Sequence, residues 1–127
     1  MYRKVLVEND IRSGERLLEQ LDLAKVPVTA AFWLYAEDAD EWRMVIVSPF
    51  VETHGPRQLY TLIGVMLTNP AGPPIPIPLE RIFLLGPHDI RYQEVRMAAL
   101  GGGTGLLVTG GPSRNISAED AYIYRVA

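Results

Sequence analysis

The sequence predicts a single α+β domain over residues 1–127, with a mainly antiparallel sheet of about five strands and two or three helices packed on it. The chain has 127 residues, which is enough for one core and too few for two ordinary domains. Hydrophobic residues make up 48% of it and charged residues 21%, as is typical of globular proteins. Helical and strand-like apolar patterns follow one another in the order helix, strand, strand, helix, strand, helix, strand, strand.

The first helix is predicted over residues 10–24. Its apolar side chains fall on one face at helical spacing, and its charged side chains lie elsewhere. Asn9 or Asp10 can cap the start, and Pro27 stands where a helix cannot continue. The apolar face consists of Ile11, Leu17, Leu18 and Leu21.

Residues 28–48 predict an antiparallel hairpin. The segments VTAAFWLY and WRMVIV are rich in β-branched and aromatic residues, and the polar stretch AEDADE connects them. Two faces alternate along the second strand: Trp42, Met44 and Ile46 on one, and Arg43, Val45 and Val47 on the other. Because both faces are mostly apolar, we expect this strand at an inner position of the sheet.

A second helix is predicted to begin at Pro56, with Gly55 as its cap. Its apolar stripe is about three turns long and ends before Asn69-Pro70. The stripe comprises Leu59, Leu62, Ile63, Met66 and Leu67. The stretch PAGPPIPIP that follows has five prolines in nine residues, so we expect an extended connector there.

The last third of the chain predicts three strands and a further helix. The segment LERIFLLG is typical of a buried strand, and LLVTG and AYIYRV indicate two more. Residues 88–100 fit a helical face but also alternate like a strand at 90–93. We favour a helix there, because Pro87, His88 and Asp89 suit a helix start and RMAAL contains good helix formers.

A glycine-rich segment, GGGTG at residues 101–105, raises the question of phosphate binding. A Walker loop requires a lysine after its second glycine, and this chain has no lysine after Lys25. The dinucleotide pattern GxGxxG fails in both registers, because Leu106 and Val108 occupy the position of the third glycine. We therefore interpret the segment as a surface loop or a close-packed turn.

An alternative function uses this loop together with the start of the second helix. Backbone N–H groups at 56–58 could bind an anion, with His54 and Arg57 beside them. Gly103, Thr104 and Gly105 would complete a cleft if the two segments were neighbours in space. The alternative hypothesis is therefore a protein that binds a small molecule or an anion, and this hypothesis includes an enzyme that acts on such a ligand.

The sequence assigns no catalytic residue, no metal site and no cofactor. The absence of cysteine excludes thiolate metal sites and a cysteine nucleophile. The two histidines lack metal-binding spacing, and no serine lies in GxSxG. An acidic group without an EF-hand pattern is interpreted as a solvated hairpin tip: Glu37, Asp38, Asp40 and Glu41.

Aromatic residues on the predicted strands carry the leading functional hypothesis. They are Trp33, Tyr35, Trp42, Tyr122 and Tyr124. Aromatic residues are enriched at protein interfaces, although core packing under helices is their more common role. The hypothesis is a non-enzymatic interaction module that forms a homo-oligomer or binds a protein partner.

Charge and hydropathy argue against nucleic acid and membranes as partners. The net charge is −3, and a nucleic-acid surface would need a basic face built from Arg12, Arg16, Arg91 and Arg96. The longest apolar stretches are too short to span a bilayer, and Glu8 and Asp10 interrupt the first apolar run before it reaches signal-peptide length. We expect a cytoplasmic protein.

Overall fold

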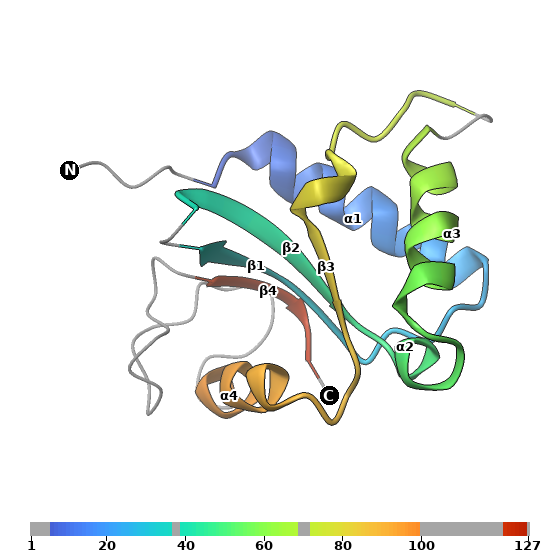
Figure 1. Cartoon of the computed structure of the whole chain (residues 1–127). Helices are drawn as coiled ribbons and strands as arrows, with labels where there is room; N and C mark the ends of the chain where they lie inside the picture. Colours follow the sequence, from blue (N-terminus) through green and yellow to red (C-terminus); the bar gives the residue numbers. More distant parts are fainter. Residues whose placement is uncertain (1–5, 37–38, 69–71, 100–120, 127) are drawn as a thin grey trace.

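The structure, a computed structural model, describes residues 6–36, 39–68, 72–99 and 121–126, which form a four-stranded sheet with helices on both faces (Figure 1). The strand order is β3-β2-β1-β4. The strands are β1 (Ala30–Ala36), β2 (Glu41–Val47), β3 (Ile82–Leu85) and β4 (Ala121–Arg125). The helices are α1 (Glu8–Leu23), α2 (Pro49–His54), α3 (Pro56–Thr68), the 3₁₀ turn η1 (Leu79–Arg81) and α4 (Ile90–Ala99).

The α+β class is confirmed, but the prediction of a mainly antiparallel sheet of five strands is not. Strand β1 is antiparallel to β2 and β4, whereas β2 and β3 are parallel, so the described sheet is mixed. The helices α2 and α3 and the proline connector carry the chain back along the sheet before β3 begins, which makes β3 parallel to β2. The strand predicted at LLVTG lies outside the described residues.

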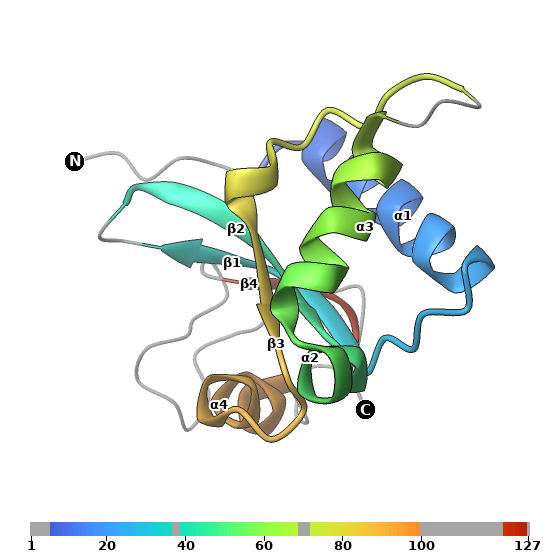
Figure 2. The same cartoon turned by 45° about the vertical axis from the view of Figure 1, so that its right-hand side comes forward.

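Strand β2 occupies an inner position, as its two apolar faces predict. Trp42, Met44 and Ile46 belong to a core under α1 and α3, which contribute Leu17 and Ile63 to it. The opposite face of the sheet forms a second core, in which Phe32, Val45, Val47 and Ile123 pack with Tyr92 and Val95 of α4. Figure 2 shows α1 and α3 on one side of the sheet and α4 on the other.

The sequence prediction placed Leu79–Arg81 in a strand, where the structure has the turn η1, and it missed helix α2. Its signal is the pair Ser48-Pro49: the Ser48 Oγ accepts a hydrogen bond of 3.1 Å from the Phe50 N–H, and Pro49 occupies the first turn. Gly55 then has φ 85°, a left-handed conformation that glycine adopts without strain, and α3 begins at Pro56 as predicted. The segment that was ambiguous between helix and strand is the helix α4.

The proline connector is part of the core. Ile75 and Ile77 are buried, while the prolines on either side of them are exposed. The Ile75 N–H donates to the Leu67 carbonyl at 2.8 Å. On the other side, the Arg16 guanidinium donates to the Pro73 and Pro74 carbonyls at 2.6 and 3.3 Å. The connector is therefore held against both α1 and α3.

The hydroxyl of Tyr124 ties β4 and β1 to α1. It accepts a hydrogen bond of 2.8 Å from Trp33 Nε1 and donates one to the Ile11 carbonyl. Burial raises the pKa of Tyr124, since the phenolate would lose its hydration. Gly14 of α1 faces this hydroxyl, and a Cβ atom at that position would overlap the tyrosine side chain.

Substitution of Tyr124→Phe should lower the free energy of unfolding by about 1–3 kcal/mol, because the Trp33 and Ile11 groups lose their partner inside the protein. Gly14→Ala should also destabilise the protein through overlap with Tyr124. In the double variant the overlap with the hydroxyl is gone, so Gly14→Ala should cost less there by about 0.5 kcal/mol or more. Urea unfolding of the four proteins measures this coupling, and strictly additive effects would contradict the packing of Gly14 against Tyr124.

Glu52 joins α2 to the turn between β3 and α4. Its carboxylate accepts hydrogen bonds from the His88 backbone N–H at 3.0 Å and from His88 Nδ1 at 2.9 Å. These bonds, the backbone bond first, hold the pKa of Glu52 below its ordinary value. The side chain also lies over Gly86, where a Cβ atom would overlap it.

This contact makes part of the stability dependent on pH. A carboxyl whose pKa is lowered in the folded state contributes stability above its unfolded pKa and loses that contribution as the pH falls through the folded pKa. Glu52→Gln should therefore lose less stability than the wild type between pH 6 and pH 3, roughly the range in which a glutamate titrates. Urea midpoints at each pH measure the difference, with Glu19→Gln as an exposed control. Equal pH dependence of the wild type and Glu52→Gln would refute the expectation.

Candidate functional site

The five strand aromatics proposed as an interface lie on one face of the sheet, the face covered by α1 and α3. Trp33 and Trp42 are buried there in the core. Tyr35, Tyr122 and Tyr124 pack against that core and are partly exposed. The structure thus brings the five residues together, with the two tryptophans inside the core and the three tyrosines around it.

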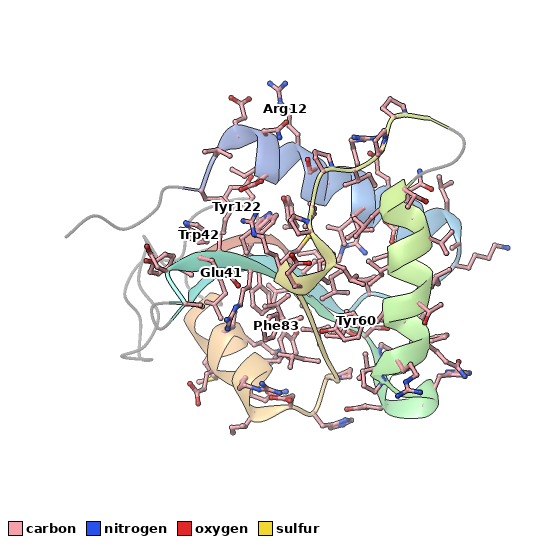
Figure 3. All side chains as sticks on the ribbon, turned by 45° about the horizontal axis from the view of Figure 1, so that its top comes forward. Arg12, Glu41, Trp42, Tyr60, Phe83 and Tyr122 are labelled. Carbon is pink, nitrogen blue, oxygen red and sulfur yellow. The ribbon has the colours of Figure 1, made fainter. Side chains whose placement is uncertain are left out.

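Two ring pairs organise this cluster. The rings of Tyr35 and Trp42 are 5.5 Å apart, and those of Tyr122 and Tyr124 are 5.4 Å apart in an edge-to-face arrangement. The Tyr35 hydroxyl donates to the Asp40 carboxylate. Figure 3 shows Trp42 and Tyr122 on the side of the sheet that α1 covers. These contacts hold the tryptophans inside the core and the tyrosines at its margin.

The ligand-binding residues of the alternative hypothesis are only partly described. His54 ends α2, is exposed, and stacks on Phe50 with ring centroids 4.2 Å apart. Arg57 is exposed in the first turn of α3. Gly103, Thr104 and Gly105 lie outside the described residues. The adjacency of the two segments therefore stays a prediction.

The arginines that a nucleic-acid surface would require do not share one face of the molecule. Arg12 and Arg16 belong to α1, whereas Arg91 and Arg96 belong to α4 on the opposite side of the sheet (Figure 1). Arg12 pairs with Glu8 at 2.6 Å and Arg91 pairs with Asp89 at 2.8 Å. These four residues therefore cannot form one continuous basic face.

Two further searches cover only the described ranges. Within them, no three histidine, aspartate or glutamate side chains come close enough together to hold a metal ion. No helix in the same part of the chain has both the length and the apolar character required to cross a membrane.

The outer edge of β3 is the surface feature that the sequence did not predict. Among the described strands, β3 has β2 as its single neighbour. The Leu85 carbonyl faces β2 and accepts from the Ser48 N–H at 3.0 Å. The Ile82 carbonyl points the other way and accepts from the Tyr60 hydroxyl at 2.8 Å. Because successive peptide groups of a strand point to alternate sides, the Leu84 N–H and C=O also face outward.

An apolar groove of about 420 Å³ runs beside this edge and is open to solvent. Tyr60, Leu79, Glu80, Ile82 and Phe83 line it. Figure 2 shows β3 and α3 side by side, and Figure 3 shows Tyr60 and Phe83 on the two sides of the strand. The Leu79 side chain, 37% exposed, lies next to Gly64 of α3.

Arg81 fixes the position of the turn η1, which lines one end of the groove. Its Nε donates to the Trp42 carbonyl at 2.9 Å, and its Nη2 lies 3.3 Å from the Asp10 carboxylate. Its guanidinium also lies over the Trp33 ring, 5.1 Å from the centroid. The turn η1, which carries Leu79 into the groove, is thus anchored to β2, β1 and α1.

Sequence patterns alone did not reveal the groove. Tyr60 falls outside the apolar stripe of its helix, and LERIFLLG indicated a strand covered on both sides. Tyr60, an aromatic residue beside that stripe, was the available sequence signal for the groove. The groove and its strand edge are the candidate functional site, and no family model, curated protein or solved structure matches this chain.

Proposed function

We propose that this protein is a non-enzymatic interaction module of the cytoplasm that self-associates through the outer edge of β3. The observation that carries the proposal is the outward-facing peptide group of Leu84 beside an apolar groove. The outer edge of a sheet offers N–H and C=O groups that can pair with another strand. In β3 the side chain of Phe83 is partly exposed, whereas Ile82, Leu84 and Leu85 are buried. A second copy of the chain supplies an edge of matching length.

The geometry favours an antiparallel pair about a two-fold axis. In such a pair, Leu84 of one copy lies opposite Leu84 of the other, and each donates its N–H to the carbonyl of its counterpart. Phe83 of one copy then lies opposite Leu85 of the other. The two sheets would join into one sheet of eight described strands.

Backbone pairing alone would give a small interface, because β3 has only four residues. A stable interface buries about 1,200–2,000 Å² in total, so apolar side chains beside the strand must contribute. Leu79, Tyr60 and Phe83 are the groove residues that can do so. The groove is therefore as important to this proposal as the strand edge.

Native mass spectrometry of the purified chain should show a species of about 28 kDa, twice the 14.1 kDa of one chain. Leu79→Lys should shift the population to monomer, since a lysine at an apolar interface leaves a charge without water. Leu23→Lys is the matched control, because Leu23 is an exposed leucine, 75% accessible, in the last turn of α1. It should leave the dimer intact.

Hydrogen exchange gives a second measurement at residue level. The Leu84 amide should exchange more slowly in wild type than in Leu79→Lys at equal concentration, while the Val45 amide of the inner strand β2 should not differ. A monodisperse wild-type monomer would refute the proposal. So would a dimer that Leu79→Lys and Leu23→Lys leave equally intact.

A further inference from the structure

A pocket on the opposite face of the sheet has a different chemical character. It has a volume of about 150 Å³ and lies between α4 and the three neighbouring strands β1, β2 and β3. Phe32 and Leu34 of β1, Val45 of β2 and Phe83 of β3 contribute apolar surface to it, and Val95 of α4 forms part of the wall. A cavity of this volume is sufficient for a group of about the size of benzene.

Arg43 supplies one positive charge to this pocket. It lies on β2 opposite Leu34, and its guanidinium stacks 4.5 Å from the centroid of the Phe83 ring. Its side chain is 26% exposed, and its Nε donates to Glu41 at 3.0 Å. Among the described residues, Glu41 is the one hydrogen-bond partner of the Arg43 side chain. Both Nη groups of Arg43 therefore remain for a ligand.

Arg91 supplies the second positive charge from the first turn of α4. Its Nε and Nη2 donate to Asp89 at 3.0 and 2.8 Å, so the guanidinium is held by a carboxylate two residues away. In the described part of the chain its Nη1 has no such partner. The two paired carboxylates fix the orientation of the two guanidiniums, and unused donors remain on both.

We propose that this pocket binds a small organic carboxylate whose apolar part is about the size of a benzene ring. The apolar part fills the space beside Phe32, Leu34 and Val45, and the carboxylate accepts hydrogen bonds from Arg43 and Arg91. The unused N–H donors of two guanidinium groups, each already paired with one carboxylate, favour an occupant with a second carboxylate over one without a charged acceptor. The proposal does not depend on self-association, since none of its steps uses a second chain.

Titration with benzoate, followed by amide chemical shifts, tests the proposal on the full-length protein. Benzoate should produce saturable shifts at Leu34, Val45 and Val95. Benzyl alcohol, which has the same ring without the charge, should bind about tenfold more weakly or worse, a difference of about 1.4 kcal/mol. Arg43→Gln should weaken benzoate binding by a similar factor, whereas Arg12→Gln, at an exposed arginine of α1 on the other face of the sheet, should leave it unchanged.

Arg91→Gln is a second variant that should fold like the wild type, because the Arg91 side chain is 68% exposed. It should also weaken benzoate binding and leave that of benzyl alcohol unaltered. Equal affinity of the wild type for the two probes would overturn the proposal. So would the absence of saturable amide shifts at benzoate concentrations up to about 50 mM, because a specific site should saturate below that concentration. Unchanged benzoate binding in both arginine variants would overturn it as well.

Discussion

Strand β2 has to be buried on both faces, and the rest of the fold is arranged around that requirement. Its side chains alternate between two cores, with Met44 and Ile46 in one and Val45 and Val47 in the other. A strand that is apolar on both sides needs cover from both sides, which α1 and α3 provide on one face and α4 on the other. It also needs neighbours at both edges, and β1 and β3 occupy these positions. Among the described strands, β3 is then the last one on this side of the sheet, and its outer edge faces away from β2.

Features that depend on neighbouring residues could be predicted from the sequence, and features that depend on distant ones could not. The two faces of β2 and the start of α3 at Pro56 follow from local patterns and were confirmed. The parallel pairing of β2 with β3 depends on the path of the chain between them, which no local pattern records. The groove beside β3 follows from that pairing, and it was missed for the same reason.

The aromatic residues show a second limit of sequence patterns. Composition places Trp33 and Trp42 on strands, but it does not say which face of the sheet a helix will cover. The structure places both rings under α1 and α3, where Trp33 also meets the guanidinium of Arg81. No sequence pattern singled out Arg81, and Arg16 was considered only as part of a basic face. In the structure each of them links distant segments through backbone carbonyl groups.

The proline connector has a consequence for the unfolded chain. Proline restricts its own backbone and that of the residue before it, so the segment from Pro73 to Pro78 has few conformations to lose on folding. Proline also has no N–H, so this part of the chain can cross the protein without a ladder of hydrogen bonds. Ile75 and Ile77 can therefore enter the core from a segment without regular secondary structure. The unfolded chain already favours the extended shape that the core requires.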